Sequence, residues 1–261
     1  MEIVIQADPE VAGDLVAQEI VRLFAAKPTA VLGLATGSSP LPIYRALRAR
    51  FKAGEVSFAQ GQAFTLDEYV GLPEGHPESY RAVIRNEIVD HLDLPASSLH
   101  TPDAHGGDLE AAAAAYDRSI TEAGGVDLQI LGIGENGHIG FNEPGGSLAS
   151  RTHVGTLTAS TREANARFFG GNPDEVPTQC ITQGLGTIME ARALVLVATG
   201  EKKAQAIAQL VEGGVSQKWP ATIMQHHPRA TVIVDEAAAA HLELADYYRH
   251  TYGSAPTWRA L

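Results

Sequence analysis

The sequence predicts an α/β protein with a mostly parallel sheet that is covered by helices on both faces. Short apolar runs rich in Val, Ile and Leu alternate with longer amphipathic runs along the 261 residues. Continuous apolar strands are typical of parallel sheets, because both faces of such a sheet are buried. The helical runs between the strands supply the crossovers that parallel pairing needs. Neither a linker nor an internal repeat is evident, so residues 1–261 are expected to form a single domain.

The expected elements follow one another along the chain. Strands are expected where apolar runs occur, at Ile3–Gln6, Val31–Ala35, Ala63–Leu66, Leu128–Ile133, Leu194–Ala198 and Thr231–Val234. Helices are expected where the pattern is amphipathic, at Pro9–Ala26, Leu41–Ala53, Ser79–Leu92, Asp108–Ala123, Glu201–Glu212 and Ala237–Tyr248. The segment 157–178 fits poorly, because it is polar and is interrupted by glycines and prolines. It is either a lid that closes over a ligand or an ordinary surface excursion.

Composition and charge limit the class of protein. Hydrophobic residues make up 44% and charged residues 19% of the chain, as expected of a soluble globular protein with a sizeable core. No apolar run approaches the roughly 20 residues of a membrane-spanning helix, and the acidic N-terminus does not resemble a secretory signal. The single cysteine, Cys180, excludes an internal disulfide framework and a multi-cysteine zinc site. A reduced, cytoplasmic setting is therefore expected.

The net charge indicates which partners to expect. Nineteen basic and 31 acidic residues give −12 with neutral histidines. This excess of negative charge argues against nucleic acid or anionic lipid as the main partner. A small anionic substrate is compatible with it, because local donors act within a screening length of about 8 Å.

A loop of small residues follows the strand expected at Val31–Ala35. It reads TGSSP, from Thr36 to Pro40, and leads into a helix. Free backbone N–H groups, hydroxyls and the helix dipole make such a position favourable for phosphate. Capping of the helix by Ser38 or Ser39 is the alternative. The loop matches neither the GxGxxG nor the Walker pattern, so nucleotide binding is not indicated.

Two adjacent acids follow the strand expected at Ala63–Leu66. Asp67 and Glu68 open the sequence DEYVGL. They emerge at the carboxyl edge, where open α/β sheets bind their ligands. One of the two is expected to face the crevice, where a carboxylate can act as a general base. A solvated acidic loop is the alternative interpretation.

The most unusual stretch is GIGENGHIGFNEPGG, residues 132–146, which leaves another expected strand at the same edge. Its glycines let the backbone approach a ligand closely. His138 is suited to proton transfer, and Asn136 or Glu143 could accept the second N–H of its ring. A metal site of His138, Glu143 and Asp67 is the alternative. The chain has neither an HExxH motif nor a close histidine pair beside it, so no metal is expected.

A second junction of strand, glycine and helix reads ATGEKKA and follows Leu194–Ala198. Lys202 or Lys203 falls in the first turn of the helix, where the helix dipole disfavours cations. An anion in front of the helix would explain such a lysine, and a solvated lysine pair is the alternative. His226 and His227 lie far along the chain and are interpreted as structural.

Taken together, these motifs resemble the glucosamine-6-phosphate deaminase (isomerase) family over almost the whole chain. The matching segments are LGLATGSSP, TLDEYVGL, LGIGENGHIGFNEPGGSLASRTH, TREANARFF, the run from Val176 to Thr187, and ATGEKKA. The resemblance implies a Rossmann-like three-layer α/β/α fold in which 157–178 is a lid. It also implies the conversion of glucosamine 6-phosphate and water to fructose 6-phosphate and ammonia. This is a step in the catabolism of amino sugars such as N-acetylglucosamine, and it uses no organic cofactor.

The resemblance assigns roles to the candidate residues. Asp67 matches the family's general base, which moves a proton between C2 and C1 of the sugar. His138 matches the residue that opens the pyranose ring, and Glu143 matches the acid coupled to that histidine. Charge-assisted bonds to phosphate explain how an acidic protein holds an anionic sugar. The phosphate clamp is expected to comprise Gly37, Ser38, Ser39, Arg167 and Lys203.

Two departures from the family pattern change these expectations. Some members have Asp where this chain has Asn136, which can accept a hydrogen bond but cannot stabilise an imidazolium by charge. Allosteric hexameric members have basic residues just after the SLASRT segment, where this chain has His153 and Gly155. We therefore expect weak or absent activation by N-acetylglucosamine 6-phosphate, and we favour a monomer over an oligomer.

Two other functions compete with this interpretation. A 6-phosphogluconolactonase, of related fold, would use the histidine to activate water, and the acid of DEYVGL would have a lesser role. A non-catalytic sugar-phosphate sensor would need a DNA-binding segment, but the chain has neither spare length nor a basic face. The DEYVGL and FNEPGGSLASRTH segments favour the deaminase.

Overall fold

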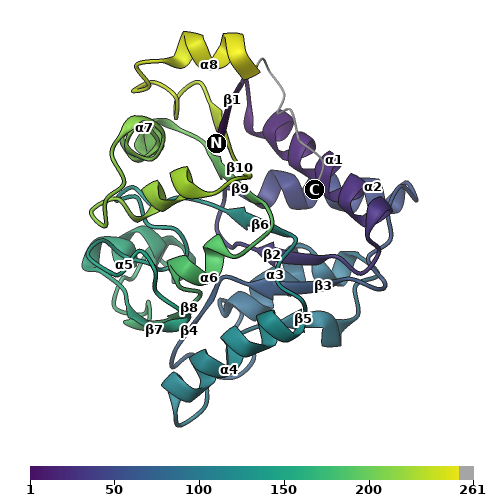
Figure 1. Ribbon diagram of the computed structural model, residues 1–261. Coiled ribbons are helices and arrows are strands. Elements are labelled where there is room, and N and C mark those ends of the chain that lie inside the picture. The colour runs from purple at the N-terminus through teal and green to yellow at the C-terminus, as the bar shows by residue number, and fades with distance from the viewer. Residues whose placement is uncertain (253–261) are drawn as a thin grey trace.

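A seven-stranded parallel sheet forms the centre of the molecule, seen in a computed structural model that describes residues 1–252 (Figure 1). The strand order is β1-β10-β9-β6-β2-β3-β5, and each neighbouring pair is parallel. The strands are β1 (Glu2–Gln6), β2 (Val31–Leu34), β3 (Gln62–Thr65), β5 (Leu99–His100), β6 (Leu128–Leu131), β9 (Leu194–Ala198) and β10 (Ala230–Asp235). The predicted fold class is confirmed.

Helices cover both faces of the sheet, with α1 and α2 on one side and α7 on the other (Figure 1). The α-helices are α1 (Pro9–Ala26), α2 (Leu41–Lys52), α3 (Tyr80–Glu87), α4 (Leu109–Glu122), α5 (Ala159–Asn165), α6 (Leu185–Met189), α7 (Ala204–Glu212) and α8 (Ala245–Tyr252). Short 3-10 segments are Val89–His91, Ala96–Ser98, Ala166–Phe168, Glu201–Lys203 and Pro220–His226. Within residues 1–252, no helix combines the length and the apolar character needed to cross a membrane.

The order of the strands reverses beside β2. The chain passes from β2 to β3 and β5 on one side, and then returns to place β6, β9 and β10 on the other side. In open α/β sheets, such a reversal leaves a crevice outside the carboxyl ends of the two strands where the order changes. Here the rule predicts that a ligand binds beyond the ends of β2 and β6.

A small antiparallel sheet adjoins this edge, with the order β4-β8-β7. It consists of β4 (Asp67–Tyr69), β7 (His153–Thr156) and β8 (Gln179–Thr182). β7 and β8 pair at the base of the segment 157–178, which contains α5. This segment packs on an apolar cluster of its own, formed by Tyr69, Leu72, Phe141, Leu157, Ala166, Phe169, Val176 and Cys180. We refer to residues 157–178 below as the excursion.

Several expected elements differ from the observed ones. The helix expected at Ala237–Tyr248 begins only at Ala245, because side chains hold the preceding backbone in turns. The carboxylate of Asp235 accepts the N–H of Ala238, and that of Glu212 accepts the N–H groups of residues 243 and 244. The helix expected at Ser79–Leu92 ends at Glu87 and is followed by a 3-10 turn. The short elements β4, β5, β7, β8 and α6 were not predicted.

Candidate active site

Three segments singled out from the sequence meet at the carboxyl edge of the sheet. The small-residue turn leaves β2, Asp67 begins β4 shortly after β3 ends, and the glycine-rich loop 132–146 leaves β6. A Cβ atom at Gly132 would lie 3.7 Å from the Cβ of Ser39, so the turn and the loop adjoin. A Cβ atom at Gly140 would lie 3.5 Å from Oδ2 of Asp67, so the acid adjoins the same loop.

The two adjacent acids have different environments, because successive residues of a strand point to opposite sides. The Glu68 carboxylate accepts the backbone N–H groups of Tyr69, Tyr80 and Arg81 at 2.8–2.9 Å, and it thereby holds the start of α3. Asp67 is 5% exposed, and no hydrogen bond from a residue that the structure describes reaches its carboxyl group. Burial, and then the charge of Glu68, raises the pKa of Asp67 well above its usual value. Asp67 is therefore the acid whose carboxyl group lies beside the glycine-rich loop.

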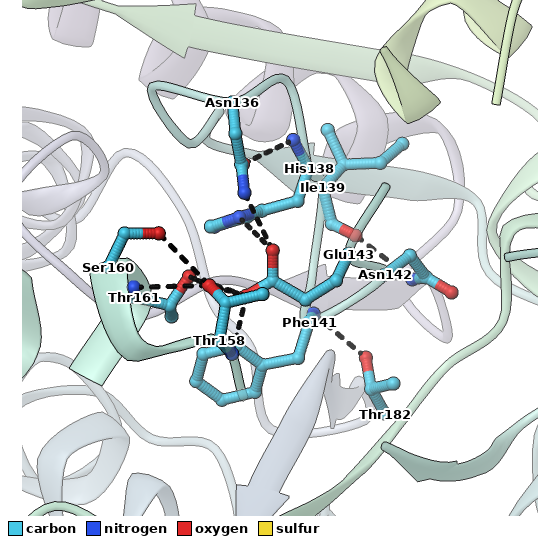
Figure 2. Close-up of polar contacts among 10 residues, drawn as sticks. All are labelled: Asn136, His138, Ile139, Phe141, Asn142, Glu143, Thr158, Ser160, Thr161 and Thr182. Carbon is cyan, nitrogen blue, oxygen red and sulfur yellow. Dashed lines mark hydrogen bonds and ion pairs between the residues drawn. The ribbon is translucent and has the colours of Figure 1, made fainter. Parts of the chain in front are cut away.

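Glu143 joins the polar side chains of the glycine-rich loop (Figure 2). Nδ1 of His138 lies 3.5 Å from Oε2 of Glu143. Nδ2 of Asn136 donates to this same oxygen at 2.7 Å. Oδ1 of Asn136 accepts the backbone N–H of His138 at 3.3 Å, so it is not the acceptor for the imidazole ring. Of the two acceptors considered from the sequence, Glu143 is the one that faces the ring.

The carboxylate of Glu143 is held in its ionised form by its neighbours. Its other oxygen, Oε1, accepts the hydroxyl of Thr161 together with the N–H and hydroxyl of Thr158 (Figure 2). Burial alone would raise the pKa of Glu143. The contact with His138 and the hydrogen bonds from Thr161 and Asn136 outweigh burial and lower the pKa to about 2. Glu143 is thus a permanent negative charge beside the imidazole at neutral pH.

The imidazole of His138 lies against the backbone of its own loop. A Cβ atom at Gly134 would lie 2.3 Å from Cε1 of the ring, so only glycine leaves room for the observed position. The alternative grouping of His138, Glu143 and Asp67 as metal ligands is not observed. Within residues 1–252, no three His, Cys, Asp or Glu side chains form a cluster that could hold a metal ion.

The serines of the turn after β2 do not cap the helix that follows. α2 has no side-chain capping hydrogen bond at its N-terminus, so Ser38 and Ser39 do not act as the cap that the sequence allowed. Gly37 has φ of 91°, a left-handed conformation that turns the chain at the end of the strand. The turn therefore combines polar groups with a helix N-terminus, which is a favourable arrangement for phosphate.

Two cations from distant segments influence each other electrostatically. Burial lowers the pKa of Lys203, and the charge of Arg167 lowers it further while that of Glu135 opposes the effect. Arg167 is exposed and lies in the 3-10 segment before β8, and Lys203 lies in the 3-10 segment after β9. Arg162 has a different role, because its guanidinium donates to the carbonyl oxygens of Pro173 and Val176 inside the excursion.

Some residues at the site were not identified from the sequence. Thr158 and Thr161 belong to the excursion and contact Glu143 across the chain. Trp219 packs on the glycine-rich loop, since a Cβ atom at Gly137 would lie 2.7 Å from its Cε3. Neither contact follows from a local motif. The interpretation of His227 as structural agrees with its hydrogen bonds, because its ring binds the carbonyl of residue 191 and the N–H of residue 229.

The chain is similar to known proteins over its whole length. The family model described as glucosamine-6-phosphate isomerases/6-phosphogluconolactonase matches residues 8–233. A glucosamine-6-phosphate deaminase of Mycolicibacterium smegmatis is 57% identical, and one of Beutenbergia cavernae is 59% identical. Each alignment covers 100% of both chains.

Solved structures agree with the sequence relatives. A monomeric glucosamine-6-phosphate deaminase is 38% identical and superposes with a TM-score of 0.90, over 92% of this chain and 100% of the other. A 6-phosphogluconolactonase from Trypanosoma cruzi is 19% identical and has a TM-score of 0.74, over 93% of this chain and 97% of the other. At this low identity, the similarity shows only that the two proteins share a fold. The protein therefore belongs to the glucosamine-6-phosphate isomerase/6-phosphogluconolactonase family and, within it, to the glucosamine-6-phosphate deaminases.

Proposed function

We propose that this protein converts glucosamine 6-phosphate and water into fructose 6-phosphate and ammonia, in the breakdown of amino sugars. The relatives named above as deaminases support this activity. The observation that carries it is the buried Asp67 carboxyl, which lies beside the loop of His138 and Glu143. Removing a proton from carbon needs such a base, whereas hydrolysis of a lactone does not.

The phosphate is bound by the turn after β2 together with the two cations. Gly37, Ser38 and Ser39 supply backbone N–H groups and hydroxyls at the start of α2, and Arg167 and Lys203 supply charge. Bonds from Arg and Lys to phosphate are roughly twice as strong as neutral hydrogen bonds. The lowered pKa of Lys203 reflects the cost of burying its charge, which a bound phosphate dianion would offset.

Ring opening is the task of His138. A proton must be delivered to the ring oxygen of the pyranose and another withdrawn from the C1 hydroxyl, and an imidazole can do both near neutral pH. The ionised Glu143 stabilises the imidazolium that forms when both nitrogens of the His138 side chain are protonated. It thereby supplies the charge that Asn136 cannot supply.

Asp67 then moves the proton that turns the aldose into a ketose. The C1 aldehyde created by ring opening acidifies the C2–H bond, and the Asp67 carboxylate takes that proton to give an enolamine. The protonated acid returns it to C1, and a proton passes from the nitrogen to the C1 oxygen, which leaves a hydroxyl at C1 and an imine at C2. Water adds to this imine and ammonia departs, giving the ketone of fructose 6-phosphate. A raised pKa suits this task, because the group must both accept and return a proton.

Product assays test the proposed function. Purified protein is incubated separately with glucosamine 6-phosphate and with 6-phosphogluconolactone, and release of ammonia and opening of the lactone are followed. We expect rapid ammonia release and no lactone hydrolysis above the spontaneous rate. Lactone hydrolysis without ammonia release would identify a lactonase, and tight sugar-phosphate binding without either reaction would identify a sensor. Either result would reject the proposal.

Further parts of the proposal concern the setting of the enzyme. We propose a cytoplasmic monomer in which the excursion acts as a lid over the crevice. His153 and Gly155 supply little fixed positive charge for a second sugar phosphate, so activation by N-acetylglucosamine 6-phosphate should be weak or absent. Initial rates with and without this effector test the point, and light scattering tests the oligomeric state. A sigmoidal substrate curve that the effector makes hyperbolic would contradict it.

A further inference from the structure

The two carboxylate oxygens of Glu143 contact different parts of the chain (Figure 2). Oε2 faces the glycine-rich loop, where it accepts a hydrogen bond from Asn136 and lies 3.5 Å from Nδ1 of His138. Oε1 faces the start of α5, where it accepts from Thr158 and Thr161. The side chain is only 11% exposed, so water has little access to replace these donors. The orientation of the carboxylate therefore depends on both sets of donors.

The Thr161 hydroxyl donates to Glu143 and also accepts the hydroxyl of Thr158 at 3.0 Å, but it takes no part in capping α5. Thr158 is the N-cap of α5, and its hydroxyl accepts the backbone N–H of Thr161 at 3.3 Å. Its single hydroxyl proton is shared among several neighbours. Thr161 is 6% exposed, and its hydroxyl donates to Oε1 of Glu143. Removal of this hydroxyl therefore leaves the helix cap in place.

We propose that Thr161, assisted by Thr158, is a positioning residue for the ring-opening step. It holds Oε1 of Glu143 so that Oε2 stays directed at Nδ1 of His138. Without this donor, only the longer bonds from Thr158 hold Oε1. The carboxylate then turns more easily away from the imidazole, and the imidazolium is less well compensated. The proposal rests on the deaminase activity proposed above. It also means that the excursion takes part in catalysis through α5.

Three single variants test this role. Thr161→Val removes the hydroxyl and keeps the branched shape, Thr161→Ser restores the hydroxyl, and Ser160→Ala is the matched control. The exposed Ser160 hydroxyl contacts Thr158 but not Glu143. For glucosamine 6-phosphate we expect kcat to fall by about 10- to 100-fold in Thr161→Val, as for loss of a hydrogen bond to a charged group. KM should change less than about twofold, since no substrate contact is removed.

The Glu143→Ala variant shows whether Thr161 acts through Glu143. In that background, Thr161→Val should lower kcat by less than about twofold more, because the group that it positions is gone. A structural contribution of Thr161 would instead lower kcat by the same factor in both backgrounds. Circular dichroism of each variant checks that the fold is retained, and the affinity of an acyclic amino-alditol phosphate checks the binding site.

Each outcome decides the matter. The proposal holds if Thr161→Val loses kcat, Thr161→Ser and Ser160→Ala retain most of it, and the loss disappears beside Glu143→Ala. It is overturned if Thr161→Val keeps the wild-type kcat, if it changes KM alone, or if Thr161→Ser is equally impaired. A wild-type protein that releases no ammonia would instead refute the proposed deaminase activity, so the two failures are distinguishable.

Discussion

Replacement of Glu143 by Gln tests the charge on which the site depends. The change keeps the length and planar shape of the side chain but removes the negative charge beside His138. One end of the new amide would face the Nδ2 of Asn136, which is itself a donor. Both the stability and the activity should therefore fall.

The size of the stability effect follows from the pKa of Glu143. Its value falls from 4.5 to about 2 on folding, because the donors around the carboxylate outweigh its burial. At about 1.4 kcal/mol per pH unit, this corresponds to roughly 3 kcal/mol of stability that the ionised form supplies. The folded pKa is the lower one, so this contribution is complete above about pH 5.5 and is lost as the pH falls from about 4.5 toward 2. Since Gln can still accept some hydrogen bonds, we expect a loss of about 1–3 kcal/mol at neutral pH.

Urea unfolding of both proteins at about pH 7.5, 5.5 and 3.5 measures this effect. The gap in unfolding free energy should be nearly equal at the two higher values and clearly smaller at the lowest. Glu163→Gln, an exposed glutamate of the same helix α5, serves as the control and should show almost no gap. Ammonia release by Glu143→Gln should fall at least about 100-fold, as for an impaired acid–base group. A gap of the same size at all three pH values would refute the electrostatic reasoning.

Three further changes test separate parts of the site. Asp67→Asn should abolish ammonia release. It should also make the protein increasingly more stable than wild type as the pH rises above about 4, because the raised pKa makes ionisation of this acid costly in the folded state. Urea unfolding that shows a constant or reversed gap in unfolding free energy would contradict this. Gly134→Ala should keep the melting temperature within a few degrees but lower kcat by about 100-fold, because the Cβ of the new alanine would displace the His138 ring. Full activity of this variant would show that the position of the imidazole is not critical. Lys203→Met should raise KM for the phosphorylated substrate by about 10-fold or more and weaken inhibition by inorganic phosphate, whereas Lys202→Met, at an exposed lysine, should change neither. Equal effects of the two variants would argue against a specific phosphate-binding role of Lys203.

The main sheet could be predicted because its strands are continuous apolar runs. Leu194–Ala198 was predicted with the observed bounds, and all five of its residues are buried. The small sheet could not be predicted in this way. Asp67–Tyr69 is three residues long, too short for a period to appear, and two of its residues are polar. Its existence depends on pairing with β8, more than 100 residues along the chain.

The candidate site residues could be predicted where they follow the ends of expected strands. Asp67, His138 and Glu143 were all identified because each follows an apolar run at the same edge of a parallel sheet. Residue chemistry alone could not decide between Asp67 and Glu68, since that choice depends on which side of β4 contacts α3; the family resemblance singled out Asp67. Nor could the sequence identify Thr161, because the contact with Glu143 exists only when the excursion folds back over the glycine-rich loop.

The contrast between Asp67 and Glu143 supports the roles proposed for them. Both are carboxylates with little exposure, yet burial raises the pKa of Asp67 while donors lower that of Glu143 to about 2. A carboxyl group without donors exchanges a proton readily with a substrate, and one surrounded by donors keeps its charge throughout. The first is suited to carry the proton between carbons, and the second is suited to stabilise the imidazolium of His138. The donors therefore support these roles, and a variant that removed the hydroxyl of Thr161 would make Glu143 more like Asp67.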